Sequence, residues 1–236
     1  MMQRQTSSNS RSLGRIEIFA NLAPDVLASI EKRCAWRSYD SGEIIIDYLD
    51  KSNDVFFIIS GKARASLYSA KGKVVTFSDM GPSEMFGEYG AIDGAPRSAS
   101  IEARTRCLIA SMPGSAFRGL LQSQPTVAFN LIGQIVTRVR TLTTRIYEFS
   151  ALAVNNRIQA EVLRLARLAP QTGGTISVDP APIHADIATR TSTHREAVTR
   201  ELNRLAKLGI LERRGKVLII KDVARLASMV HKATGE

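Results

Sequence analysis

The sequence predicts an α+β protein with a β-rich N-terminal part, one long helix, and a C-terminal part of helices and a basic hairpin. Three observations support this fold class. Short β-prone runs separated by glycine-containing turns fill residues 36–112, and apolar residues after Pro125 recur at alternating intervals of three and four. The last third combines helix patterns with a hairpin pattern. At 236 residues the chain is long enough for two modest domains.

The composition limits the kind of partner. Lys and Arg number 32 against 22 Asp and Glu, and the formal charge of +10 favours a polyanion such as nucleic acid. A soluble basic protein without such a partner would carry the same charge. Only Cys34 and Cys107 are present, outside any CxxC motif, which fits a reducing cytoplasm and gives no zinc or iron–sulfur site.

Neither a membrane span nor a signal peptide is expected. No run of about 20 apolar residues occurs, and the Ser- and Arg-rich residues 1–15 lack the apolar centre of a signal peptide. We therefore expect a cytoplasmic protein with no membrane partner and a flexible tail over residues 1–15.

Residues 16–124 are expected to form the first domain, an antiparallel sandwich or barrel. Strand patterns occur at 43–49, 54–60, 62–68, 73–79, 98–104 and 107–112. Before them, residues 16–34 are typical of a short helical entry, with Pro24 at a first-turn position.

Residues 125–154 are expected to form one long helix with an apolar stripe. Six residues at a/d spacing form this stripe, which we call the seam, and Ala153 would continue it: Ile132, Ile135, Val139, Leu142, Ile146 and Phe149. A helix lying on its own β-domain would have the same stripe. A length near 28 residues, about 42 Å, would overhang a small domain, so we expect the seam to pair two copies in a homodimer.

Residues 155–236 hold more than half of the excess charge, with 14 Lys and Arg against 8 Asp and Glu. Helix patterns cover 157–169, 183–191 and 193–209; a Gly173–Gly174 turn and a strand at 175–178 follow the first of them. A hairpin at 210–220 and an amphipathic segment complete the chain. Three helices followed by a basic hairpin predict a winged helix-turn-helix.

The helix that begins near Thr193 has the features of a DNA recognition helix. Thr193 and Glu196 have the spacing of a capping box, and Gly209 supplies a left-handed end. Its outer face carries Arg195, Glu196, Thr199, Arg200 and Asn203, and Lys216 lies in the hairpin. On an isolated helix such a face would be ordinary surface. Beside a second helix and a basic hairpin, it is predicted to enter the major groove of double-stranded DNA, with paired helices about 34 Å apart.

The segment "HREAVTREL", residues 194–202, resembles the recognition helix of the CRP/FNR family of bacterial transcription regulators, in its cyclic-AMP receptor branch. The residues Arg195, Glu196 and Arg200 match the pattern with which that branch recognises a GTGA-type half-site. The resemblance covers nearly the whole chain after the tail. It implies an N-terminal jelly-roll β-roll, a dimerisation helix, a winged helix-turn-helix, palindromic TGTGA-like DNA sites, and RNA polymerase as a partner. Ser192 and Arg190 depart from the family, which usually has Gly and an aliphatic residue there.

The loop "FGEYGAIDGAPRSAS", residues 86–100, places a carboxylate and a guanidinium nine residues apart. Glycine-rich loops can expose N–H groups to an anion, and Arg97 suits a phosphate. Glu88 can accept a hydrogen bond from a ribose hydroxyl. From these residue types alone, an Arg97–Glu88 salt bridge that closes a turn is the alternative.

The order of residues in this loop resembles the phosphate-binding cassette of cyclic-nucleotide-binding domains. The resemblance implies that Gly87 allows close approach of the ligand and that Glu88 holds the ribose 2′-hydroxyl. It also implies that Arg97 and Ser98 hold the cyclic phosphate and that Ser98 can favour a guanine.

The residues expected at the base of the nucleotide lie on the long helix. By alignment with the family, its adenine-contacting Thr-Ser pair falls on Leu142 and Thr143, so the first hydroxyl is missing. The resemblance to the cyclic-AMP receptor branch makes cyclic AMP the first expectation for the effector, while the missing hydroxyl leaves cyclic GMP, or relaxed selectivity, open.

Other classes of protein agree less well with the residues present. A CRP/FNR regulator with another ligand or none stays open, but the oxygen-sensing type has clustered N-terminal cysteines and the haem type needs a histidine in the sensor. The three histidines, His184, His194 and His231, all lie in the C-terminal part, which also removes the ligands of a metal-dependent cupin enzyme. No G-x-S-x-G, P-loop or HExxH motif is present, and a kinase regulatory subunit would give the recognition helix no role. We expect no enzyme activity and no metal.

Overall fold

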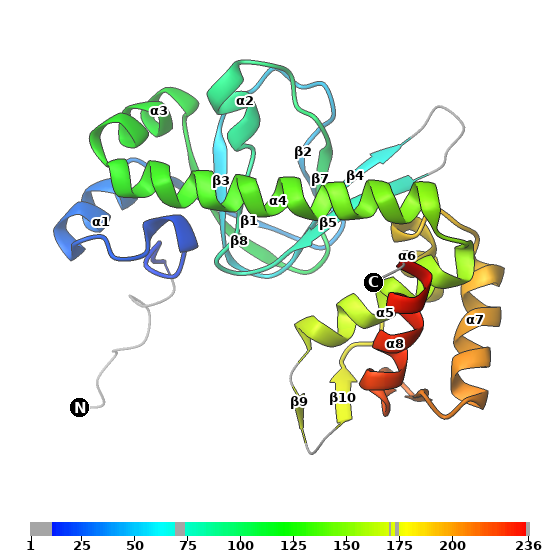
Figure 1. The fold of residues 1–236 in the computed structure, drawn as a ribbon. Coiled ribbons are helices and arrows are strands. Elements are labelled where there is room, and N and C mark those ends of the chain that lie inside the picture. Colours follow the sequence, from blue (N-terminus) through cyan, green and yellow to red (C-terminus); the bar gives the residue numbers. More distant parts are fainter. Residues whose placement is uncertain (1–10, 69–73, 170, 173–174, 235–236) are drawn as a thin grey trace, which may run out of the picture. The chain divides into compact units, whose positions relative to one another are not determined.

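The structure, a computed structural model, describes residues 11–68, 74–169, 171–172 and 175–234 (Figure 1). The chain divides into two compact units, residues 1–138 and 139–236, and the division falls inside the long helix α4 (Pro125–Ala151). Most of the predicted tail, 1–15, and the predicted Gly173–Gly174 turn lie outside the described residues.

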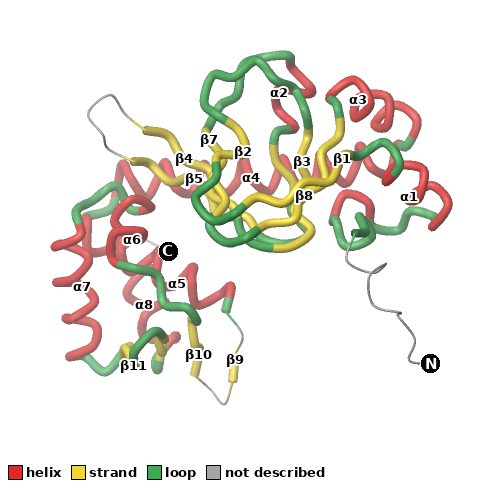
Figure 2. The backbone as a smooth tube through the Cα atoms, turned by 180° about the vertical axis from the view of Figure 1, so that it is seen from behind, coloured by secondary structure: helices red, strands yellow, loops and turns green. Residues whose placement is uncertain are grey.

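The first unit contains two four-stranded antiparallel sheets. One has the order β1 (Ala35–Tyr39), β8 (Cys107–Met112), β3 (Val55–Ser60) and β6 (Met85–Phe86). The other has the order β2 (Ile44–Ile46), β7 (Ser100–Ala103), β4 (Ala63–Tyr68) and β5 (Val74–Met80). Helices η1 (Glu17–Phe19), α1 (Pro24–Glu31), α2 (Glu88–Asp93) and α3 (Gly114–Ser123) complete the unit. Figure 2 shows α1 and α3 at one end of the strands and the β4–β5 hairpin at the other.

The six predicted strands are confirmed, and Pro24 is the first residue of α1 as expected. Strands β1 and β6 were not among them. Most residues of β1 are not buried, so its sequence has little apolar alternation, and β6 has two residues.

Strand β3 separates two apolar cores, which explains its continuous apolar run. Val55 and Phe57 pack with the helices, whereas Phe56 and Ile58 pack with the second sheet. Because successive side chains of a strand point to opposite faces, four apolar residues in a row fill both layers. Complete burial of Phe57 stabilises the unit by about 1.5–3 kcal/mol. Strand β6 pairs with β3, so the first core also fixes the start of the glycine-rich loop.

The second unit is a winged helix-turn-helix, as predicted. After α4 come α5 (Val154–Leu168), α6 (His184–Arg190) and α7 (Arg195–Lys207), with α8 (Val223–Thr234) at the end. A four-stranded sheet has the order β11 (Leu211–Arg214), β12 (Val217–Ile220), β10 (Thr175–Val178) and β9 (Gln171–Thr172). We call the β11–β12 hairpin the wing.

Two helix ends differ from the prediction and one agrees. Helix α4 ends at Ala151, before 154, because Ala153 is extended and caps α5. The capping box of Thr193 and Glu196 is wrong: His194 is the N-cap residue of α7, and the Thr193 N–H donates to the Ala188 carbonyl of α6. Gly209 has φ +72° and ends α7 as expected. There the N–H groups of Gly209 and Ile210 donate to the carbonyls of Ala206 and Leu205.

Most of the predicted seam is exposed in the single chain. Ile132, Val139 and Ile146 are 55%, 56% and 66% exposed, and Leu142 and Phe149 are exposed too. Ile135 instead packs on the N-terminal core. Phe129 and Val136, which were not predicted, extend the exposed stripe.

In the part of the chain that the structure describes, no helix is both long and apolar enough to cross a membrane. The same residues contain no group of three or more His, Cys, Asp and Glu that could hold a metal ion.

Candidate functional site

Gly87 makes the turn between strand β6 and helix α2. It has φ +85°, in the left-handed region that favours glycine. A Cβ atom there would lie 2.7 Å from the Asp54 carbonyl oxygen and 2.9 Å from an Arg97 guanidinium nitrogen. Glycine therefore lets the chain approach both neighbours closely and places Glu88 as the first residue of α2.

Glu88 is 1% exposed and forms an ion pair with Arg138 of α4. Arg138 also donates to the Met85 carbonyl oxygen at 2.9 Å. Burial raises the pKa of the Glu88 carboxyl, and the positive charges of Arg138 and Arg97 oppose this shift. The pair holds a charged carboxylate within the first unit, where an isolated one would be costly.

Arg97 is 3% exposed, and its guanidinium binds oxygen atoms of the surrounding loops. Its Nε donates to Ser52 Oγ at 3.1 Å, and its terminal nitrogens donate to the carbonyls of Gly87 and Asp54, both at 2.8 Å. The Arg97 N–H donates to the Asp50 carbonyl at 2.9 Å, which ties its backbone to the same loop. These three side-chain bonds use three of the five guanidinium N–H groups.

Among the described residues, Glu88 and Arg97 do not pair with each other. The salt bridge that would have closed a turn is therefore absent, and each group is held by other partners. Two buried opposite charges that approach the same loop and remain separate can accept a ligand with a hydroxyl and an anionic group.

The other three residues expected at the ligand are exposed. Ser98 follows Arg97 directly. Leu142 and Thr143 lie on the part of α4 that belongs to the second unit, and the Thr143 hydroxyl donates to the Val139 carbonyl at 3.0 Å. The places of Ser98, Leu142 and Thr143 at a nucleotide stay predictions.

Helix α7 has one buried and one exposed face. Val198, Leu202 and Leu205 are in the core of the second unit. Arg195, Glu196 and Arg200 are exposed, so their donors and acceptor are available to base edges. Ser192 has φ +51° in the turn before α7, a left-handed conformation that favours glycine.

The Thr199 hydroxyl is turned to His184 rather than to the exposed face. It donates to the Arg195 carbonyl at 3.0 Å and lies 2.7 Å from His184 Nδ1. Since the hydroxyl has a single proton, His184 is assigned as the donor through Nδ1–H. His184 Nε2 then accepts from Arg213 of the wing at 3.4 Å, a long contact. Thr199 therefore positions α7 through this contact, and its contact with a base stays a prediction.

The wing presents cations at its tip. Arg213, Arg214 and Lys216 are exposed, and Gly215 forms the turn with φ +58°. Such a tip suits contacts to phosphate groups, which position a protein on DNA without recognising sequence.

Comparison with known families assigns both units. Residues 36–124 match the cyclic nucleotide-binding domain, and residues 156–229 match the Crp-like helix-turn-helix domain. The chain belongs to the CRP/FNR family. It is a DNA-binding transcription regulator with a cyclic nucleotide-binding domain, and not an enzyme.

Two CRP/FNR relatives and one solved structure are similar over most of the chain. The "CRP-like cAMP-activated global transcriptional regulator" of Mycobacterium tuberculosis is 28% identical, over 91% of this chain and 96% of the relative. The "cAMP-activated global transcriptional regulator CRP" of Salmonella typhimurium is 24% identical, over 79% and 90%. The structure of a CooA double mutant from Carboxydothermus hydrogenoformans has the same fold, with a TM-score of 0.79 and 20% identity over 92% and 95% of the two chains.

Sequence reasoning for this CRP/FNR chain missed Arg138 as the partner of Glu88. Arg138 lies 50 residues after Glu88, and the apolar positions from which α4 was predicted do not include it. The available signal was an arginine directly before Val139, at a position that flanks the seam.

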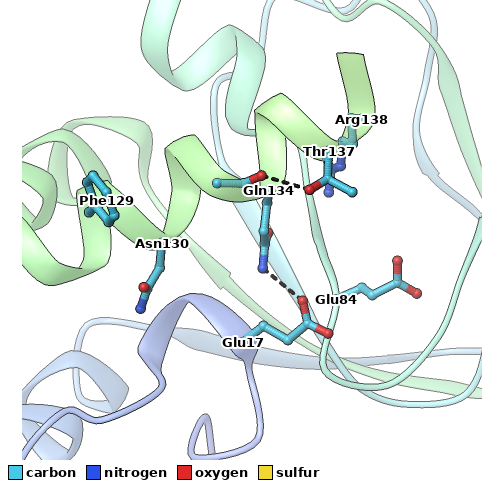
Figure 3. A pocket seen from close by; sticks show the side chains of 8 residues that line it. Glu17, Glu84, Phe129, Asn130, Gln134, Thr137 and Arg138 are labelled. Carbon is cyan, nitrogen blue, oxygen red and sulfur yellow. Dashed lines mark hydrogen bonds between the residues drawn. The ribbon is translucent and has the colours of Figure 1, made fainter. Parts of the chain in front are cut away.

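A groove beside α4 was also not predicted. Its volume is about 580 Å³, and one of its lining residues is Arg138, the ion-pair partner of Glu88. Figure 3 shows Gln134 pointing from α4 to Glu17, to which it donates a hydrogen bond at 3.1 Å. Burial raises the pKa of Glu84 in its wall, and the Gly81 N–H opposes the shift. Two carboxylates make the groove a poor phosphate site, so it is distinct from the candidate nucleotide site.

Proposed function

We propose that this CRP/FNR protein is a homodimeric regulator whose binding to palindromic TGTGA-like DNA is controlled by a cyclic nucleotide, with cyclic AMP as first choice and cyclic GMP as second. One observation carries the effector proposal. Glu88 and Arg97 are both buried, approach the same glycine turn, and are held by partners other than each other.

The proposed roles follow from the donors and acceptors of these side chains. A ribose hydroxyl would donate to Glu88, which Arg138 keeps charged. The phosphate would accept from the two guanidinium N–H groups of Arg97 that have no partner among the described residues. Ser98 would add a hydroxyl to the phosphate. Leu142 and Thr143 would meet the base. The two relatives named above are cAMP-activated by name, which supports the same choice.

The DNA proposal rests on the exposed face of α7. Arg195 and Arg200 would each donate to a guanine, Glu196 would accept from a cytosine amine, and Lys216 would contact phosphate. Bound nucleotide would act through its different affinities for two arrangements of the dimer. RNA polymerase as a partner stays a prediction.

One experiment tests both halves: fluorescence anisotropy of a TGTGA-type palindromic duplex with ligand-free protein, at stated salt, without nucleotide and with cyclic AMP or cyclic GMP. We expect cyclic AMP to tighten binding. Equal binding in all arms would contradict effector control and leave a constitutive regulator; no binding in any arm would contradict the DNA site.

Three variants make the test specific. Glu88→Gln should weaken the nucleotide response by about 10–100-fold in nucleotide concentration, because a charged hydrogen-bond acceptor is lost. Glu84→Gln is the matched control, a partly buried neighbouring carboxyl that should leave the response unchanged. Glu196→Ala should relax discrimination at one base pair by about 1–3 kcal/mol, and unchanged discrimination would contradict the proposed register of α7.

A further inference from the structure

A buried ionic cluster of five side chains joins three helices inside the second unit. Arg145 and Glu148 come from α4, Glu161 and Arg164 come from α5, and Arg190 comes from α6. Glu161 is 1% exposed and Glu148 is 9% exposed. This cluster has no part in the proposed contacts with nucleotide or DNA.

Glu161 is the centre of the cluster. It pairs with Arg164 of its own helix and accepts from Arg190 at 3.1 Å through Oε1. Arg145 lies 3.8 Å from Oε2 of the same carboxylate. Arg164 also donates to both oxygens of Glu148, at 2.7 and 2.9 Å. One carboxylate of α5 therefore contacts α4 and α6 at once.

Arg190 is the third guanidinium of the cluster, beside Arg145 and Arg164. Burying a charge costs several kcal/mol unless its partners compensate. Through its contact with Glu161, Arg190 links α6 to the cluster.

The cluster lies where the long helix turns into the DNA-binding domain. The helical conformation is interrupted between α4 and α5, at Leu152 and Ala153. Arg157 makes a second link across this corner, donating to the Thr191 carbonyl at 3.1 Å and to the Leu152 carbonyl at 3.3 Å. The first helix of the helix-turn-helix is thus tied to the end of α4 through α5 by side chains.

We infer that Arg190 is a positioning residue, which through Glu161 fixes α6 to the end of α4 and so carries a rearrangement of α4 to the recognition helix. This role rests on the proposed function, because the rearrangement would follow nucleotide binding. Arg190 itself contacts neither nucleotide nor base.

The test uses the full chain with Arg190→Ile, which keeps the other four residues of the cluster and removes the link. Arg167→Ile is the matched control, since it removes the same charge from an exposed site on α5. In ligand-free protein, amide hydrogen exchange over residues 184–190 should be roughly tenfold faster in Arg190→Ile and unchanged in the control. The ratio of DNA affinities with and without cyclic AMP, about 5–150-fold for typical coupling, should fall toward 1 in Arg190→Ile alone.

Each result decides one question. Unchanged exchange over α6 in Arg190→Ile would overturn the positioning role, and an unchanged affinity ratio would overturn the coupling. A general loss of stability would weaken DNA binding in both arms and leave the ratio as it is. If the DNA affinity of the wild-type protein were the same with and without cyclic AMP, the proposed function would be contradicted. The hydrogen-exchange measurement would still decide whether Arg190 positions α6. If Arg190→Ile does not fold, Arg190→Gln provides the same comparison, and Arg190→Lys should restore part of the ratio.

Discussion

Gly87 combines a left-handed backbone with close approach to two neighbours. Its φ of +85° is costly for any residue with a Cβ atom. The neighbours are the Asp54 carbonyl oxygen and the guanidinium of Arg97, so an added methyl group would meet one fixed backbone atom and one buried charge. The same residue therefore supports both the turn and the position of Arg97.

Replacing Gly87 with Ala should lower the free energy of unfolding of the first unit by about 2 kcal/mol or more, because left-handed strain of about 1–2 kcal/mol adds to the clash. Trp36 is the single tryptophan and lies in β1, so its fluorescence during urea denaturation follows this unit. Gly94→Ala is the control, with φ +72° and no atom within 4 Å of the added Cβ. Gly94→Ala should be destabilised by the left-handed strain alone. Equal losses of unfolding free energy in the two variants would show that the close contacts at Gly87 contribute nothing.

At the scale of elements, helices and strands with strong local patterns were predictable. The strand at 175–178 and the end of α7 at Gly209 agree with the sequence, because a strand pattern and a glycine each act locally. The capping box failed because the Thr193 N–H already donates to the Ala188 carbonyl, in the bond that closes the end of α6. The turn itself forms with Ser192 left-handed, which the sequence alone did not establish.

The candidate site was predictable only where its residues follow one another in the chain. Gly87, Glu88 and Arg97 lie within eleven residues and form a motif. Ser52, Asp54 and Arg138 come from other loops and from α4, and they contact the motif through the folding of the first unit. No local pattern marks a carbonyl or a hydroxyl as a partner of a distant arginine.

His184 joins three elements of the DNA-binding unit, α6, α7 and the wing, through Thr199 and Arg213. Burial lowers the pKa of His184, and the charges of Arg213 and Arg195 lower it further. A protonated imidazole would place a donor against the Arg213 guanidinium. The contacts of His184 with Thr199 and Arg213 therefore require a neutral imidazole.

The folded protein should lose stability as the pH falls from 7.5 toward 5.5. The unfolded chain takes up a proton at His184 near pH 6.5, the ordinary value, whereas the folded chain resists it until a lower pH. The contribution of neutral His184 to the free energy of unfolding is thus complete above the pKa that His184 has in the unfolded chain. It is lost as the pH falls through the lower pKa that His184 has in the folded protein. Thermal unfolding at several pH values should show a smaller pH dependence for His184→Asn than for wild type. His231→Asn, an exposed control, should behave as wild type; equal slopes in all three would contradict the assignment.

At the scale of the whole molecule, the exposed stripe of α4 must be explained. A monomer would leave Phe129, Ile132, Val139 and Ile146 in water along one helix. Contiguous apolar patches of this kind usually mark an interface. The a/d spacing matches a second helix of the same kind, and a two-fold pair would present two recognition helices to the two halves of a palindrome.

Ile146→Glu should therefore convert a dimer into a monomer, because each interface would bury two carboxylates at a cost of several kcal/mol per charge. Thr144→Glu is the matched control, since it adds the same charge at an exposed position that the helix turns away from Ile146. Sedimentation equilibrium should give twice the chain mass for wild type and control, and the single mass for Ile146→Glu. The monomer should also bind a half-site and its palindrome with similar affinity, since the second recognition helix is no longer linked. A wild type that sediments as a monomer, or an Ile146→Glu variant that remains a dimer, would show that the stripe serves another partner.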